Sequence, residues 1–390
     1  MSRARCGVRQ VRGVSLVELM VAMVLGLVLM LGVIQIFSAS QAASRLAEGA
    51  SRVQENARFA LDFLERDLRM AGHMGCVNDQ AHVVKDLGDP VSHLGAAVAS
   101  GSPLDFRVSI QGYEAPGTAP GEALTLGGTW GAPAGLPDSL GSLSPAPAGG
   151  SDILVMRYLA AEGVPVDTIS VDGGDSTIRM DAGRIARISA GGVGRPTLFG
   201  IADCSHADVF AGDLSGDTVS AADVDLGRYT VQPTGQTMVY RAESLVYYVG
   251  RNADTGLRGL RRARADSTGA YTVNEELVEG IENLQLLYGL DATAAITPGT
   301  PPTGNITQLA TASVVSPAAD RTPAAAARWL RVGQVRVGLL AASESAASPV
   351  QPEAAMAALG LTFRNAARND GRYRATYEST IALRNRLFGN

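Results

Sequence analysis

A single carboxylate stands inside an otherwise apolar stretch near the start of the chain. Residues 14–37 read VSLVELMVAMVLGLVLMLGVIQIF, and Glu18 is the one charged side chain among them. Four arginines precede the stretch without an intervening acid: Arg3, Arg5, Arg9 and Arg12. A carboxylate in a membrane-spanning helix costs roughly 2.5–3.5 kcal/mol, so it needs a cationic partner. The chemistry that this pattern indicates is a charge pair in an apolar environment.

The stretch is long enough to place that carboxylate in a membrane. At about 1.5 Å per residue, a helix over residues 14–37 measures about 36 Å, and a bilayer core is about 30 Å thick. The preceding arginines predict a cytoplasmic N-terminus and an exported remainder. A cleaved secretory signal would have a shorter apolar region, although residues 38–42 offer small side chains like those of its cleavage site. A plain membrane anchor would leave Glu18 unexplained.

The residues around Glu18 resemble a third kind of segment. Gly13–Leu19 (GVSLVEL) is similar to the class III signal of type IV pilins and pseudopilins, except that Val14 stands where the family usually has Phe. The resemblance implies cleavage after Gly13 by prepilin peptidase and N-methylation of Val14. It also implies that Glu18 pairs with a terminal amine during assembly, either its own or a neighbour's. Loss of the leader would lower the formal charge from −5 to −9.

Two cysteines remain outside that leader, which contains Cys6. Cys76 and Cys204 would be exported, and thiols in an oxidising periplasm form disulfides. Such a bridge would close a loop for which the chain-entropy model gives about 4–5 kcal/mol. The alternative is a zinc site of two cysteines and two histidines, with His73 and His206 as the further ligands. We expect the disulfide, and no metal or other cofactor.

Other polar clusters predict no further chemistry. Asp213, Asp217 and Asp223 resemble a calcium-binding loop, but the glycine required at its sixth position is missing, so we expect an acidic turn between two strands. No nucleophile elbow, zinc-protease motif or phosphate-binding loop is present in the sequence. His82 and His93 stand alone in loop-like sequence and are expected to be surface or satisfied polar residues. We therefore expect no enzymatic activity.

Composition limits the possible partners and classes. The 390 residues include 33 basic and 38 acidic ones, a balance that argues against nucleic acid as the main partner. Four His and three Cys make a multi-metal or haem protein improbable. With 45 Gly and 18 Pro, the chain is rich in turns. It is long enough for two average domains or for one large domain with insertions.

The remaining periodicity predicts one long helix and a β-rich head. Apolar residues between Ser38 and Ala71 recur at helical spacing, with Gly72 and Gly75 after them, and the charged residues between them are expected to face solvent. Strands are expected at 152–158, 237–249, 332–340 and 376–383. Residues 275–288 fit either a helix or a strand, and residues 353–359 a short helix. Segments 115–150 and 291–327 are expected to be surface insertions rather than folded units.

The fold class that follows is α+β, with a long N-terminal helix packed on an antiparallel sheet. Its parts would be a leader (1–13), a transmembrane or filament-core helix (14–37), an amphipathic continuation (38–75) and a head (76–390). This is the pilin architecture, in which the head lies in the periplasm before assembly and in the extracellular pilus afterwards.

The body resembles the PilW family of type IV pilus minor pilins. The residues that carry this resemblance are 69–72 with 75–76, 199–204 with 207–210, 247–249 with 260–262, 278–285 with 288–289, and 383–385. The family implies a low-abundance pilin that works with other minor pilins, the major pilin and the inner-membrane assembly platform. It primes assembly and helps display an adhesin at the tip. The alternatives are a J-type pseudopilin of type II secretion and an anchored periplasmic enzyme or binding module.

Overall fold

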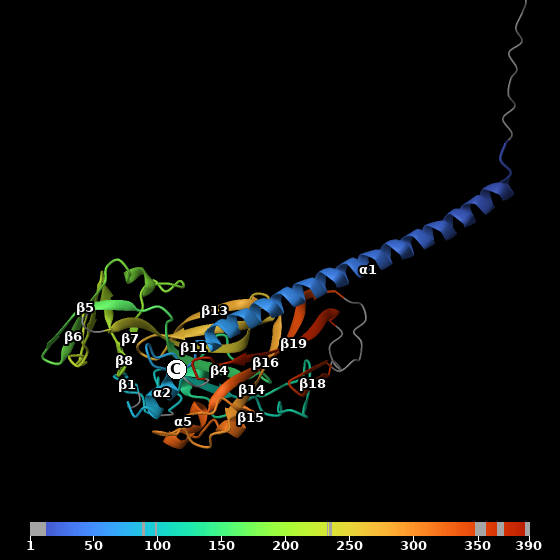
Figure 1. Ribbon diagram of the computed structural model, residues 1–390. Helices are drawn as coiled ribbons and strands as arrows, with labels where there is room; N and C mark the ends of the chain where they lie inside the picture. The colour runs from blue at the N-terminus through green and yellow to red at the C-terminus, as the bar shows by residue number, and fades with distance from the viewer. Residues whose placement is uncertain are drawn as a thin grey trace, which may run out of the picture.

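The computed structural model describes residues 13–87, 90–97, 100–231, 233, 236–347, 356–364 and 370–386. Its dominant element is helix α1 (Leu16–Leu68), whose 53 residues extend about 80 Å. The first half of α1 protrudes alone from a β-rich head, and the second half lies along it (Figure 1). A long N-terminal helix on a mostly antiparallel sheet confirms the predicted α+β class.

The second half of α1 is helical because its apolar residues form one buried stripe. Val53, Ala57, Ala60, Leu64 and Leu68 are fully buried, at spacings of three and four that place them on one face. This confirms the predicted amphipathic helix. It ends three residues before the predicted limit at Ala71, and the following Gly72 adopts a φ of +82° that suits a residue without a side chain.

The head is organised around β11 (Met238–Arg251), the strand at which a 12-stranded sheet branches. Its first residues pair with β7 (Leu198–Ala202) and β5 (Val164–Asp172), and its later residues pair with β4 (Ile153–Leu159) and β12 (Arg258–Ala265). The outer partners of β12 and β4 are β13 (Tyr271–Glu279) and β2 (Ile110–Tyr113). The predicted strands at 152–158 and 237–249 are confirmed as β4 and β11.

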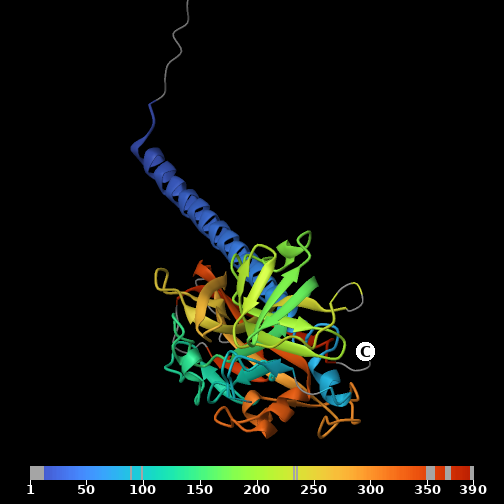
Figure 2. The same ribbon diagram turned by 90° about the vertical axis from the view of Figure 1, so that its left-hand side faces the viewer.

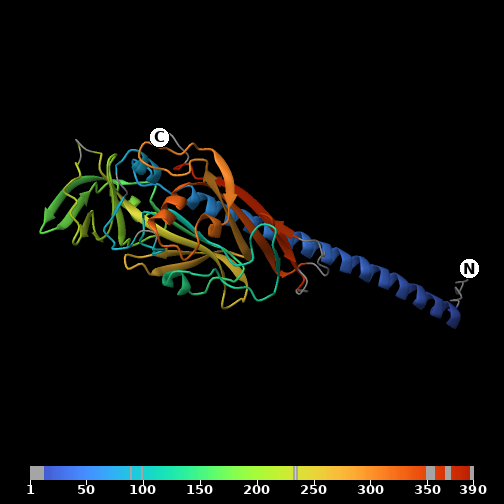
Figure 3. The ribbon, with the colours of Figure 1, turned by 90° about the horizontal axis from the view of Figure 1, so that it is seen from below.

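Residues 164–231 form what we call the distal lobe, because it lies at the end of the head opposite the protruding helix (Figures 1 and 3). Besides β5 and β7, it contains β6 (Asp175–Met180), a 3-10 helix (Ile185–Arg187), β8 (Ala207–Ala211), β9 (Asp213–Ser215) and β10 (Thr218–Ala221). The lobe encloses a hydrophobic cluster of its own, which includes Ile178, Phe199 and Phe210. Strand β1 (Val91–Ser92) pairs in parallel with β8.

A second sheet lies under α1, and its strands come from the C-terminal part of the chain. Its order is β15 (Ile306–Ala310), β14 (Ile281–Asp291), β16 (Val332–Ala346) and β19 (Arg372–Ala382). Gly280, with φ +82°, separates β13 from β14 and turns the chain from one sheet into the other. The ambiguous segment 275–288 is therefore strand throughout, apart from this turn. The strands predicted at 332–340 and 376–383 are confirmed as β16 and β19.

Small elements complete the head, as the view along the molecule shows (Figure 2). They are α2 (Asp79–Val84), α3 (Asp138–Gly141), α4 (Ala312–Val315) and α5 (Pro323–Leu330), with a sheet of β3 (Ala123–Thr125), β17 (Met356–Ala358) and β18 (Leu361–Arg364). The main core lies between α1 and the sheets and includes the edge-to-face pair Tyr288 and Trp329.

Two predictions about local structure are wrong. Segments 115–150 and 291–327 are not mere insertions, because β15 joins the second sheet and residues such as Leu140 and Val315 are buried in the core. Of the helix predicted at 353–359, the described residues form strand β17, which pairs with β18 across a turn at Leu359 and Gly360. In both cases pairing with a neighbouring strand determines a structure that the short apolar groups of the sequence leave open.

Candidate functional site

The candidate site at the N-terminal end of α1 combines a backbone N–H with one carboxylate. Gly13 and Val14 are exposed and non-helical, and Ser15 is extended and begins the helix. The Ser15 backbone N–H donates a hydrogen bond to Glu18 Oε2 at 3.3 Å. Glu18 thus lies one turn inside the helix with its carboxylate directed back toward the chain end. A cut between Gly13 and Val14 would place an α-amine one residue from this hydrogen bond.

The side chains that follow Glu18 form a continuous exposed apolar surface. The large hydrophobic residues of 16–37 are all exposed, including Leu29, Ile36 and Phe37. By length and composition α1 is a helix that could cross a membrane, and its most apolar window has no contact with the head. An apolar surface of this size is unstable in water, so it requires lipid or other apolar helices around it.

A buried polar network fixes the other end of α1 to the head. Asp67 Oδ2 accepts hydrogen bonds from Tyr247 Oη at 2.5 Å and Arg262 Nη1 at 3.2 Å, and Arg262 also contacts Glu275 at 2.6 Å. Burial, and then the nearby charge of Asp67, raises the pKa of Tyr247 well above its usual value. The prediction that the charges of this helix face solvent is wrong for Asp67, which is only 5 % exposed.

Cys76 and Cys204 form a disulfide, with their Cα atoms 4.9 Å apart. The bond ties the segment after α1 to the loop between β7 and β8, as expected. It also excludes the zinc alternative, because both sulfurs are consumed by the bond to each other. Of the other two proposed ligands, His73 has its Nδ1 2.8 Å from the Leu159 carbonyl oxygen. Burial lowers the pKa of His73, against the opposing effect of that backbone hydrogen bond.

The three aspartates that resemble a calcium loop lie around a hairpin. Asp213 is in β9, and Asp217 occupies the turn before β10, where it contacts Arg179 at 3.2 Å. The backbone N–H of Asp223 instead donates to Asp175. The predicted turn between two strands is thus confirmed for Asp217, whereas Asp213 lies within β9 and Asp223 lies beyond β10. Within the residues that the structure describes, no three His, Cys, Asp or Glu side chains converge as metal ligands would.

A cluster of ion pairs and hydrogen bonds around Asp208 in the distal lobe was not predicted from the sequence. Asp208 on β8 is buried and accepts hydrogen bonds from His93 Nε2 at 2.8 Å, from Arg228 Nε at 3.1 Å and from Tyr229 Oη. Burial by itself would raise the pKa of the Asp208 carboxyl, but the hydrogen bonds from these three residues outweigh it and lower the pKa. His93 is therefore a satisfied polar residue. No local pattern could reveal the pairing, since 115 residues separate His93 from Asp208.

The residues that carry the resemblance to the PilW family prove to join distant segments. Glu282 on β14 binds Arg372 Nη1 at 2.8 Å and Arg374 Nε at 2.7 Å, both on β19. The amide of its neighbour Asn283 donates to the Gly150 carbonyl oxygen at 2.6 Å. Near the C-terminus, Asn385 Nδ2 donates to the Arg69 carbonyl oxygen at 2.8 Å. These contacts hold the head together and indicate architecture rather than catalysis.

Comparison with known families gives two matches at opposite ends of the chain. Residues 8–34 match the prokaryotic N-terminal methylation motif, which covers Gly13, Val14 and Glu18. Residues 246–385 match the family described as type IV pilus-assembly protein W. No curated protein and no solved structure matches the chain. Residues 1–12, with Cys6 and the four arginines, lie outside the described residues. The two matches support a PilW-like type IV minor pilin, and the protruding helix on a β head is a pilin-like fold.

Proposed function

We propose that prepilin peptidase cuts the chain between Gly13 and Val14, that Val14 is N-methylated, and that the mature subunit enters a filament through the first half of α1. The observation that carries the proposal is the arrangement of α1. Its apolar first half is fully exposed and preceded by an accessible Gly13–Val14 bond, while its second half is built into the head. Before assembly the exposed half would anchor the subunit in the inner membrane, with the head in the periplasm.

Glu18 is the residue proposed to set the register of the subunit in the filament. Its carboxylate lies among apolar side chains, where an unpaired charge is costly, and a new amine at Val14 of its own or a neighbouring subunit would neutralise it. Its hydrogen bond to the Ser15 N–H shows that the carboxylate can already reach the backbone beside the new terminus.

Processing is tested by changing the residue before the proposed cut. Gly13→Val should block cleavage, so the protein isolated from membranes should retain its leader and lack a methylated N-terminus by mass spectrometry. Gly7→Val, a matched change within the leader, should be processed normally. Recovery of intact leader on the wild-type protein, in cells with active prepilin peptidase, would contradict the proposal.

Assembly is tested separately at Glu18. Glu18→Ala should be cleaved and methylated but should fall about tenfold or more in sheared pili, because the buried amine loses its partner. Glu48→Ala is the control, since Glu48 lies exposed on the same helix and pairs with Arg52 at 3.0 Å. Equal incorporation of both variants would refute the assembly role of Glu18.

At the level of the pilus, we propose that this minor pilin primes assembly with other minor pilins and forms part of the tip complex that displays an adhesin. The match to the PilW family supports this assignment. Deletion should reduce pilus number, and a tagged copy should co-purify with other minor pilins at one end of the fibre. A J-type pseudopilin would instead be required for protein secretion and leave piliation intact. The family matches support a structural role rather than an enzymatic one.

A further inference from the structure

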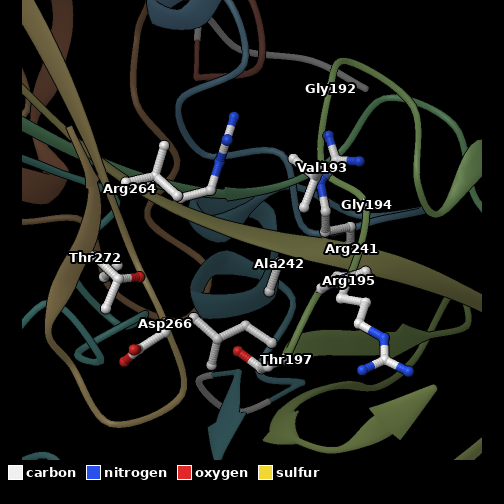
Figure 4. Close-up of a pocket in the computed structure, with 14 residues that line it drawn as sticks. Gly192, Val193, Gly194, Arg195, Thr197, Arg241, Ala242, Arg264, Asp266 and Thr272 are labelled. Atoms are coloured by element: carbon white, nitrogen blue, oxygen red, sulfur yellow. The ribbon is translucent and has the colours of Figure 1, made fainter. Parts of the chain in front are cut away.

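A pocket lies at the seam between the distal lobe and the rest of the head (Figure 4). The segment 192–198, which leads into β7, forms one wall, and residues of β11, β12 and β13 form the other. The cavity measures about 210 Å³. Sites for drug-sized ligands measure about 300–1,000 Å³, so this cavity suits a smaller molecule or a single side chain of a partner.

Two of the three arginines that line this pocket are held in place by one buried carboxylate. Glu243 accepts a hydrogen bond from Arg241 Nε at 2.6 Å and another from Arg264 Nε at 2.7 Å. Glu243 is 3 % exposed, so a buried carboxylate holds both guanidinium groups in fixed positions. Figure 4 shows the two guanidinium groups on the same side of the pocket, with Asp266 on the other side.

Both arginines retain N–H groups for a ligand. Arg241 Nη1 donates to the carbonyl oxygens of Ile188 and Ala190, at 2.7 and 2.6 Å. Within the described residues, neither Arg241 Nη2 nor the two terminal nitrogens of Arg264 take part in a hydrogen bond. Arg264, fixed through Nε, presents its two terminal nitrogens in a planar fork that matches the two oxygens of a carboxylate, and Arg241 adds the N–H groups of Nη2.

The charges and the apolar side chains that line the pocket indicate which class of ligand fits it. The lining includes Arg195, Arg241, Arg264 and Asp266, and Glu243 pairs with two of these arginines, so the formal charges of the five groups sum to one positive charge. A monoanion would balance it, whereas a phosphate group with a charge of about −1.5 to −2 would exceed it. The walls also include apolar side chains, namely Val193, Leu198 and Val273. A carboxylate on a short, partly apolar stem fits both features.

We propose that this pocket is a binding site for a carboxylate group, held by the Arg241 and Arg264 guanidinium groups that Glu243 positions. Two sources carry this chemistry: an acidic side chain of a protein partner, or an acidic sugar. The proposal does not rest on filament membership, because the pocket lies entirely within the head.

The test uses the full chain in detergent and saturation-transfer difference NMR with two probes, acetyl-glutamate amide and glucuronate. Binding of the first identifies a peptide carboxylate, and binding of the second alone identifies a sugar acid. Acetyl-glutamine amide and glucose, which lack the charge, should give no transfer. Absence of transfer to both acidic probes overturns the proposal.

Substitutions of lining residues test whether the acidic probe binds in this pocket. Arg264→Gln should weaken binding of the active probe about tenfold. Val193→Trp should abolish it by filling the cavity from the loop side while leaving the ion pairs of Glu243 intact, so it remains decisive if Arg264→Gln fails to fold. The control is Arg184→Gln, which removes the same charge from an exposed arginine of the distal lobe outside the pocket. Unchanged binding by Val193→Trp overturns the proposal.

Discussion

At the scale of single residues, the buried carboxylates of this protein contribute more to the stability of the fold than its exposed ion pairs do. Asp67, Asp208, Glu243 and Glu282 are nearly inaccessible, and each accepts hydrogen bonds from arginine. Removing one partner of such a group leaves an uncompensated charge, which is far more costly than losing a surface ion pair. Asp67, Asp208 and Glu282 therefore join segments that are distant in the sequence, whereas Glu243 joins the neighbouring strands β11 and β12.

The Asp208 centre predicts a pH dependence with a defined sign. Because the folded protein lowers the pKa of Asp208, its contribution is complete above the unfolded value of about 3.9 and is lost as the pH falls through the folded value. Asp208→Asn should lower the free energy of unfolding by about 2 kcal/mol at pH 7. The difference in melting temperature between wild type and variant should shrink as the pH is lowered from 6 to 3. The exposed Asp172→Asn should show no such trend, and a constant difference for Asp208→Asn would contradict this account.

At the scale of elements, α1 is one helix with two different environments. Its first half has no partner in the head, while its second half is packed so closely that small residues are required. A Cβ at Gly49 would lie 2.5 Å from the Ala347 Cβ and 3.6 Å from the Ser343 Cβ. Gly26, in the first half, has no neighbour within 4 Å.

This contrast predicts opposite effects for one substitution at two positions. Alanine normally stabilises a helix relative to glycine by about 0.8–1.0 kcal/mol. At Gly49 the clash with the end of β16 should outweigh that gain, so Gly49→Ala should destabilise the head by about 1–3 kcal/mol in denaturant unfolding. Gly26→Ala should leave head stability unchanged. A Gly49→Ala variant at least as stable as the wild type would show that α1 does not lie closely on β16.

At the scale of the whole molecule, the disulfide connects the segment after α1 with the distal lobe. One cysteine follows α1, and the other lies in the distal lobe, at the end of the head away from the protruding helix (Figure 1). The bond therefore limits how far the lobe can separate from the end of the helix.

Removing the disulfide should weaken the whole head. The closed loop spans 128 positions, so Cys76→Ser with Cys204→Ser should reduce the free energy of unfolding by about 4 kcal/mol in a denaturant titration. Reduced wild-type protein should show the same loss, which separates the effect of the bond from that of the serines. If the double variant unfolds at the wild-type denaturant concentration, the head does not depend on this link.

Much of the N-terminal region was predictable because its signals are local. Glu18 within an apolar run, the glycine before it and the stripe of Val53 and Leu64 each depend on residues within a few turns of helix. The pairing of Cys76 with Cys204 was also expected, since removal of the predicted leader would leave these two thiols. The strongest strands, β4 and β11, were recognisable from their β-branched and aromatic residues.

The tertiary structure alone decided the rest, because it depends on contacts between distant segments. The distal lobe was not recognised as a unit, since most of its strands are short, with three to six residues each, and become stable only by pairing with one another and with β11. The burial of Asp67 requires Tyr247 and Arg262, which lie some 180 and 195 residues further along the chain. The pocket beside the distal lobe likewise forms only because β11 and β12 bring Arg241 and Arg264 to the carboxylate of Glu243. Local sequence thus determined how this protein is anchored, and long-range strand pairing determined what its head presents.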